Sequence, residues 1–147
     1  MRLNRHLNEI KITRKFDLKK GKSRYGDWQS KFKIGELKYE VHITSGLIGE
    51  YSIAFGIVGK PLEIIGTGGN VFKVLSAVAQ SVKEFLKEME EKGEPVNLLV
   101  FTGNKDEPSR IKLYDRFAKK FEKMFGFKLT NREDIGYDIE YEFKRVK

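Results

Sequence analysis

The sequence predicts an α+β fold in which two long helices pack on a single twisted, mostly antiparallel sheet. Short runs in the first half alternate apolar and polar side chains, which is typical of half-buried antiparallel strands. Two longer stretches in the second half carry apolar residues at helical spacing. With 147 residues we expect one domain over 1–147, divided into a basic N-terminal segment over 1–24 and an α+β core over 25–147.

The alternating runs place the strands of the first half. In one run Tyr39 and Val41 share the apolar face, whereas Glu40 and His42 share the polar face, so we expect His42 at the surface. Trp28 opens another run and is expected to anchor the core. The expected elements are, in order, a strand over 7–16, a polar loop over 19–26, strands over 28–34, 37–43 and 51–57, and a short apolar run over 62–65.

Two amphipathic helices are predicted in the second half. The first carries a continuous apolar stripe from Val71 to Met89, between a suitable N-cap, Asn70, and a terminating glycine, Gly93. Pro108 suits the first turn of the second helix. The buried stripe of this second helix consists of Tyr114, Phe117, Phe121, Met124 and Phe125, and strands over 96–101, 127–130 and 137–143 complete the sheet.

The positive charge of the chain is concentrated at its N-terminus. Residues 1–24 hold nine basic and two acidic side chains, which is +7 of the net charge of +8. Such a segment attracts nucleic acid or an acidic surface on a partner protein. The alternative is an edge strand whose solvated lysines prevent unwanted strand pairing. The candidate partner-binding residues of this segment are Arg14, Lys15, Lys19, Lys20, Lys22 and Arg24.

Arg110 is a further candidate partner-binding residue, near the start of the second predicted helix. A cation at this end opposes the helix macrodipole, so it costs stability unless it pairs with an anion. The partner is either a nearby carboxylate, Asp106 or Glu107, or a bound phosphate. The sequence leaves both possibilities open.

Several classes of function are excluded by composition. The chain has no cysteine and two histidines, which excludes disulfides, a thiol nucleophile and a multi-histidine zinc site, and we predict no metal. The first residues lack the apolar region of a signal peptide, and no apolar run is long enough to span a membrane. We therefore expect a cytoplasmic protein with no membrane partner.

A glycine-rich segment, Gly66-Thr67-Gly68-Gly69-Asn70, lies between an apolar run and the first helix. Glycines let the backbone approach a ligand closely, and the free N–H groups of a helix start favour a phosphate. The spacing matches neither the dinucleotide-binding fingerprint nor a P-loop. The alternative is a tight turn that requires positive φ angles.

The order of elements, this glycine loop, and the Leu113-Tyr114 pair in a helix that ends at Gly126-Phe127 resemble the GNAT family of N-acetyltransferases. The resemblance implies a GNAT-like sheet and acetyl-CoA as a possible cofactor. It also implies that Tyr114 protonates the departing thiolate. The residues implied to hold the cofactor pyrophosphate are Gly66, Thr67, Gly68, Gly69 and Asn70.

A second resemblance, to a family of tailed-bacteriophage proteins, rests on Trp28, on Gly66-Thr67-Gly68 and on the ten residues from Glu107 to Arg116. It implies a phage origin, and therefore the cytoplasm of a host cell, but no activity. Two functions are left open. The chain binds nucleic acid, or a host or phage protein, through its basic N-terminal segment. The alternative is an acetyl-CoA-dependent N-acetyltransferase that uses the glycine loop and Tyr114.

Overall fold

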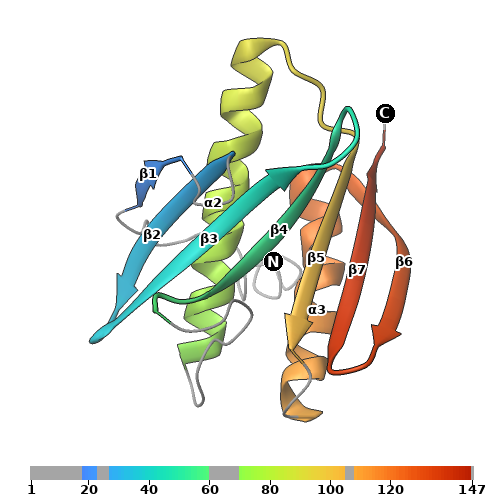
Figure 1. Ribbon diagram of the computed structural model, residues 1–147. Coiled ribbons are helices and arrows are strands. Elements are labelled where there is room, and N and C mark those ends of the chain that lie inside the picture. The colour runs from blue at the N-terminus through green and yellow to red at the C-terminus, as the bar shows by residue number, and fades with distance from the viewer. Residues whose placement is uncertain (1–17, 23–26, 60–69, 105–107, 147) are drawn as a thin grey trace, which may run out of the picture.

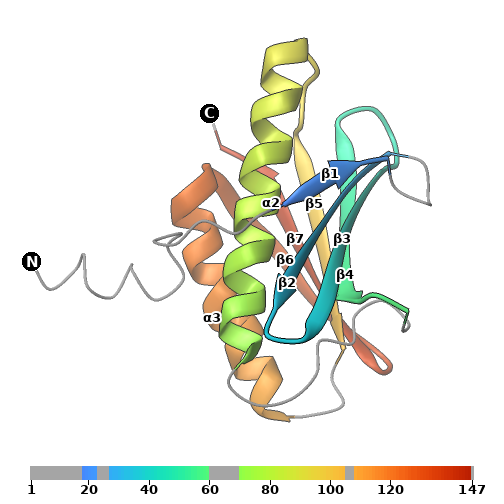
Figure 2. The same ribbon diagram turned by 90° about the vertical axis from the view of Figure 1, so that its left-hand side faces the viewer.

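The protein forms one seven-stranded sheet with two helices on the same face (Figures 1 and 2). The strand order is β1-β2-β3-β4-β5-β7-β6, and all neighbours are antiparallel except β4 and β5. The predicted α+β class with a mostly antiparallel sheet is confirmed. The computed structural model describes residues 18–22, 27–59, 70–104 and 108–146, without the side chains of residues 70–72, 104 and 108–113.

The strands of the first half agree closely with their sequence pattern, with one correction. Lys19–Gly21, expected within a polar loop, forms the short strand β1 on the sheet edge, because its backbone pairs with the next strand whatever its side chains are. The expected elements at 7–16 and 62–65 lie outside the described residues. The other strands of this half are β2 (Trp28–Ile34), β3 (Leu37–Ser45) and β4 (Glu50–Ile57).

The second half also follows its pattern. The helices α2 (Asn70–Lys92) and α3 (Pro108–Phe125) start within one residue of the predicted positions. Each ends before a glycine with positive φ, Gly93 at 72° and Gly126 at 70°, a backbone conformation that other residues rarely adopt. Neither helix is long and apolar enough to cross a membrane within the described residues. The remaining strands are β5 (Leu98–Asn104), β6 (Phe127–Ile135) and β7 (Asp138–Arg145), of which β6 is longer than predicted.

The core lies between the helices and one face of the sheet. Figure 2 shows both helices on this side, with α2 over β2 and β3 and with α3 over β6 and β7. Trp28 is buried as predicted, and its ring meets the edge of Phe85 at 5.7 Å between centroids. Under α3 the rings of Phe101 and Phe121 meet at 5.0 Å. The predicted apolar stripes are therefore the core-facing sides of both helices.

Two residues depart from the expected burial. His42 was expected at the surface, but its side chain is 1% exposed, on the sheet face away from the helices. The histidine Nε2 lies 2.9 Å from Oε1 of Glu40, which is equally buried, so the imidazole keeps a hydrogen bond inside the protein. Tyr137, expected to begin the last strand, instead lies in the turn after Gly136, before β7, and is 89% exposed.

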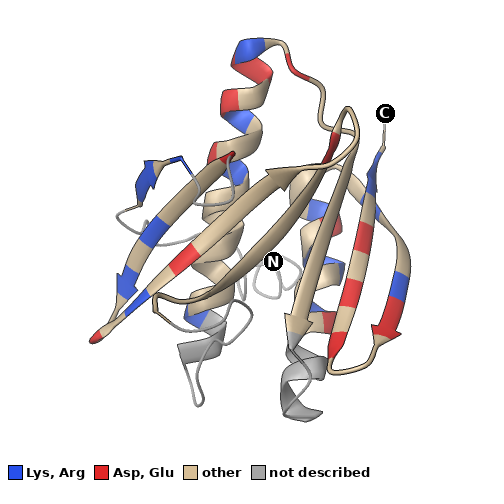
Figure 3. Cartoon of the chain, in the orientation of Figure 1, with Lys and Arg blue, Asp and Glu red and all other residues tan. Residues whose placement is uncertain are grey.

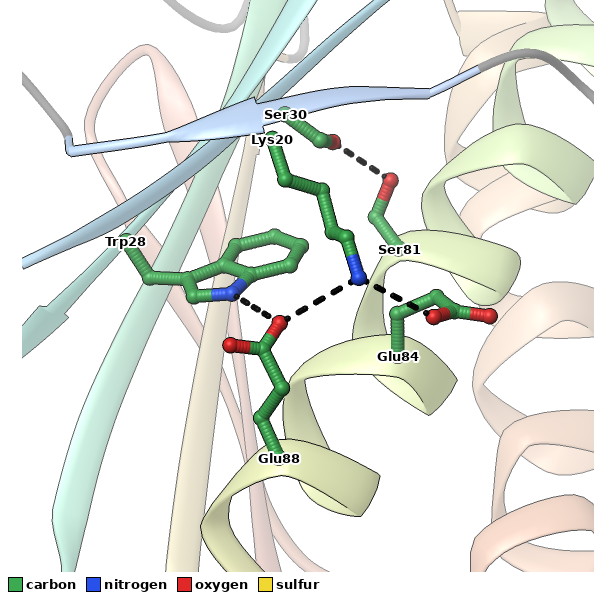
Figure 4. Close-up of polar contacts among 6 residues, drawn as sticks. All are labelled: Lys20, Trp28, Ser30, Ser81, Glu84 and Glu88. Atoms are coloured by element: carbon green, nitrogen blue, oxygen red, sulfur yellow. Dashed lines mark hydrogen bonds and ion pairs between the residues drawn. The ribbon is translucent and has the colours of Figure 1, made fainter.

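Polar contacts fasten the β1–β2 edge to α2 (Figure 4). The Lys20 ammonium lies 3.3 Å from Oε1 of Glu84 and 3.5 Å from Oε2 of Glu88. The Trp28 indole N–H donates to the same Glu88 oxygen at 3.0 Å. Thus one carboxylate joins β1 and β2 to the last turns of α2.

A buried hydroxyl pair lies beside this cluster. Ser81 Oγ donates its one hydrogen to the Ala77 carbonyl at 3.0 Å, as helical serines often do. The Ser30 hydroxyl, 2.7 Å from Ser81 Oγ, is therefore the donor of the bond between them. With these donors and acceptors, removing the Ser81 hydroxyl leaves the Ser30 O–H without an acceptor. Removing the Ser30 hydroxyl leaves the Ser81 O–H bonded to Ala77.

We therefore predict that Ser81→Ala destabilises the fold by about 1–3 kcal/mol, since it leaves a buried O–H without an acceptor. Ser30→Ala leaves the Ser81 hydrogen bonded and should cost less than about 1 kcal/mol. Urea unfolding of both variants and of the double variant measures the difference. Equal costs for the two single variants would contradict this donor order.

Candidate functional site

The described part of the basic segment lies on the open sheet edge, and its lysines separate onto two faces. Lys20 points to the helix side, where burial would lower its pKa but the hydrogen bond to Glu84 and the nearby Glu88 raise it above the ordinary value. Its charge is thus already paired. Lys19 pairs in register with Lys31 and lies on the other face, which carries no described helix.

Lysines of the next two strands extend this helix-free surface. Alternation along β2 places Lys31 and Lys33 on it, and the register pairs Lys33 with Lys38 of β3. These side chains are exposed. They line a groove of about 440 Å³ that we call the lysine groove. Its described lining consists of Lys19, Lys31, Lys33, Lys38, Phe32 and Val58.

The electrostatics of the lysine groove are unfavourable in the isolated protein. Lys19 lies directly opposite Lys31, and Lys33 directly opposite Lys38, whereas on its other side Lys31 lies opposite the buried Glu40. Like charges opposed across neighbouring strands destabilise a sheet. No ion pair neutralises these four lysines within the described part of the chain. A bound anion would therefore relieve two repulsive pairs at once.

Carboxylates occupy the other end of the same face (Figure 3). Glu133 of β6 lies directly opposite Glu140 of β7, and alternation adds Glu142 to this acidic end. The helix-free face therefore carries the four groove lysines and the buried Glu40 over β1 to β3, and opposed carboxylates over β7 and β6. A further opposed pair, Lys128 and Lys144, lies at the other end of β6 and β7 on the same face.

The structure brings only part of the predicted binding set together. Lys19 belongs to the lysine groove, Lys20 is paired with glutamates, and Lys22 is exposed just beyond β1. The backbones of Asn70 and Arg110 are placed in the first turns of α2 and α3. The residues that lie outside the described part are Arg14, Lys15, Arg24, Gly66, Thr67, Gly68 and Gly69.

Sequence analysis missed Lys31, Lys33 and Lys38. Beyond residue 24 the chain carries 20 basic and 19 acidic side chains, and that near-neutral sum hides a local cluster. The available signal was the spacing of these lysines, two apart along one strand and opposed across a hairpin that follows the basic segment. Within the described residues, no group of three or more side chains is placed to hold a metal ion.

A second candidate site lies where β4 and β5 part. Their parallel pairing runs from Glu50 and Leu98 to Ile53 and Phe101, and no later pair is in register. Each strand nevertheless continues past this point, β4 to Ile57 and β5 to Asn104. The two central strands therefore diverge toward the ends at which the helices begin (Figure 1).

Backbone groups of β4 point into this divergence. The N–H of Val58 donates to the Lys38 carbonyl on β3 at 2.9 Å. Because backbone groups of successive strand residues point to opposite sides, those of Phe55 and Ile57 are directed toward β5. No residue of β5 is in register with them. An extended ligand with amide groups could bond to this stretch as an added strand would.

Tyr114 lies beneath the divergence, in the core. Its side chain is 4% exposed, and its ring packs on Gly103 of β5, where an added Cβ would lie 2.7 Å from Cε2 of the ring. It lines a cavity of about 10 Å³, the limit for one water molecule. This space is too small for a thioester. Its proposed role as an acid stays a prediction.

The neighbouring residue, Asp115, links α3 to the last two strands. The Arg132 guanidinium donates twice to this carboxylate, at 2.8 and 3.2 Å, and the Tyr141 hydroxyl donates at 2.6 Å. Burial alone would raise the pKa of Asp115, but these hydrogen bonds outweigh it and hold the pKa below its ordinary value. Burial, followed by the bond to Asp115, raises the pKa of Tyr141. These contacts hold Tyr141, which lines the cavity beside Tyr114, in place.

No model of a known protein family matches the chain, and no curated protein matches it in sequence. Among solved structures it is similar to two apo crystal forms of RimL, the ribosomal L7/L12 alpha-N-protein acetyltransferase, at 11% identity to each. The first match covers 81% of this chain and 61% of RimL, less than two thirds of that protein, with a TM-score of 0.40. The second covers 80% and 69%, with a TM-score of 0.43. No statement about activity follows from these values.

The lowered pKa of Asp115 predicts how the stability supplied by Tyr141 depends on pH. A depressed carboxyl pKa contributes stability that is present above the unfolded value and is lost as the pH falls through the folded one. Tyr141→Phe should therefore cost about 1–2 kcal/mol at pH 7, and less as the pH is lowered toward 2. Urea unfolding across this range measures it.

Tyr137→Phe removes the same hydroxyl from an exposed turn residue and should have no effect at either end of the pH range. A Tyr141→Phe penalty that does not change with pH would show that the hydroxyl does not depend on a charged Asp115.

Proposed function

We propose that this protein binds nucleic acid through its basic N-terminal segment together with the lysine groove. The observation that carries the proposal is the set of two opposed lysine pairs on one sheet face, none of which forms an ion pair within the described residues, although Lys31 also lies opposite the buried Glu40. As the resemblance to tailed-bacteriophage proteins implies, the protein would be phage-encoded and act in the cytoplasm of an infected cell.

The energetic basis of such binding is the release of counterions. Each lysine that neutralises a phosphate frees condensed cations, and this entropy drives association without regard to sequence. The basic segment, with +7 over residues 1–24, continues directly into the edge strand that bears Lys19. Of the described lysines of this segment, Lys19 belongs to the groove, whereas Lys20 contributes less because it is already ion-paired.

We predict that replacing the four groove lysines with Gln weakens binding to a fluorescein-labelled duplex by at least roughly tenfold at 50 mM salt. The fold should stay intact, because exposed charges contribute little to stability. Fluorescence anisotropy measures the affinity, and the melting temperature checks the fold.

A matched control removes the same charge from the opposite side of the molecule and should keep the affinity within about twofold. It replaces four exposed lysines of the helices, called the helix lysines: Lys73, Lys83, Lys87 and Lys123. Equal losses of affinity in both quadruple variants would show that the net charge of the protein, and not the groove, determines binding. Absence of any nucleic-acid binding would leave an acidic host or phage protein as the partner.

A second candidate function, acetyl-CoA-dependent N-acetyltransfer, is favoured by the divergence of β4 and β5. The amides of a pantetheine arm could bond to the backbone groups of Phe55 and Ile57 that face β5. The buried position of Tyr114 and the small cavity beside it count against a general acid at that place. We therefore rank this function second.

Thermal unfolding with and without acetyl-CoA tests the second candidate. A ligand at 100 times its Kd stabilises the native state by about 2.7 kcal/mol, which is a shift of several degrees in Tm for a domain of this size. The expected result under the first proposal is no shift. A shift that coenzyme A also produces, and that a bulky Gly56→Val substitution on β4 abolishes, would favour the acetyltransferase.

A further inference from the structure

We infer that the lysine groove binds the phosphate backbone of double-stranded nucleic acid and makes no contact with the bases. The inference rests on the proposed nucleic-acid binding and names the form of nucleic acid that this surface recognises. It follows from four features of the described residues: buried aromatic rings, a groove lining without base-reading groups, the spacing of the lysines, and the carboxylates on the same face.

Within the described residues, no exposed aromatic ring is available for base stacking at the groove. Phe32 is 4% exposed and stacks on Tyr39 at 5.6 Å, and Trp28 is 9% exposed with its N–H bonded to Glu88. Proteins that prefer single strands place exposed aromatic side chains under successive bases. The one strongly exposed ring in the described part of the chain, Tyr137, lies in the β6–β7 turn at the acidic end. The described part of the groove therefore offers no ring for stacking on the bases of a single strand.

The described groove also lacks groups that distinguish one base from another. Apart from its lysines it is lined by Phe32 and Val58, so no amide, hydroxyl or carboxylate faces a base edge. What the groove offers is positive charge. Phosphate contacts of this kind set affinity and register but carry no sequence information.

The lysines are spaced for neighbouring phosphates. Lys31 and Lys33 are two residues apart on β2, roughly 7 Å along the strand, and each has an opposed lysine about 5 Å away on a neighbouring strand. Four ammonium groups thus cover an area of roughly 10 by 7 Å. A duplex presents one phosphate for each 1.7 Å of its axis, and counterion release per contact is about 0.9 against 0.7 for a single strand. The denser charge of the duplex is therefore the better match.

The opposed carboxylates of β6 and β7 limit how far a bound duplex can extend across the sheet. Between β3 and β7 lie three strand spacings, roughly 14 Å, which exceeds the screening length of about 10 Å at 0.1 M salt. At this salt concentration Glu133 and Glu140 are therefore largely screened from the groove, whereas at lower salt they repel phosphates that reach across the sheet. The groove lysines supply about four phosphate contacts, one each.

Anisotropy titrations of the full chain between 50 and 200 mM salt test the inference. The probes are two labelled 20-base-pair duplexes of unrelated sequence, one of their single strands, and inorganic polyphosphate. We expect the two duplexes to bind within about twofold of each other and both to bind more tightly than the single strand. Replacing the four groove lysines with Gln should make the duplex salt slope about 3.6 less steep, and the helix-lysine control should leave it unchanged.

A further variant tests whether these carboxylates repel a bound duplex. Glu133→Gln with Glu140→Gln should strengthen duplex binding severalfold at 50 mM salt and have little effect at 200 mM, since screening removes the repulsion. Thr102→Gln with Ser52→Gln, neutral changes on the same face, should not reproduce this dependence on salt.

Three results would overturn the inference. They are tighter binding of the single strand, a preference of more than about tenfold between the two duplexes, and an unchanged slope in the groove variant while the duplex still binds. In each of these cases the protein still binds nucleic acid, so nucleic-acid binding itself survives, but an unchanged slope would remove the groove from the proposed binding site. If polyphosphate binds but neither nucleic acid does, both the inference and the proposed function fail.

Discussion

The structure depends on one constraint, that both helices cover the same face of a single sheet. Alternation along each strand then assigns every side chain either to the core or to the helix-free face. The short strand β1 illustrates this assignment, because Lys20 turns inward to Glu84 and Glu88 whereas Lys19, one residue earlier, turns to the open face. Of these two lysines, Lys20 therefore holds β1 against α2, and Lys19 contributes its charge to the helix-free surface.

This constraint also concentrates the charges of distant segments. Hairpin registers between β1 and β3 bring lysines directly opposite one another, and the register of β6 and β7 does the same for Glu133 and Glu140. Each arrangement costs stability in the isolated sheet, since like charges repel across neighbouring strands. Surfaces that accept such a cost without an internal partner are suited to a ligand of opposite charge, and at the β1–β3 end that ligand is an anion.

The centre of the sheet supplies a different chemistry. The parallel pair of the described sheet, β4 and β5, parts after Ile53 and Phe101, so the later backbone groups of β4 are not paired with β5 beside the small cavity at Tyr114. Gly103 allows the Tyr114 ring to lie against β5, and Asp115 ties the same helix to Arg132 and Tyr141. Tyr114 is buried among mostly apolar residues, which suits a packed core better than a proton donor in a reaction.

The sequence by itself determined the fold class, the strands β2 to β4 and both helices. Period-two and helical patterns report burial directly, and Gly93 and Gly126 mark the helix ends. It also located the charge asymmetry and Lys19. Only the tertiary structure decided that Lys20 is paired, that Lys31, Lys33 and Lys38 join the site, and that His42 is buried against Glu40. Pairing partners across strands and helices are set by register and packing between residues far apart in the chain, and no local pattern encodes them.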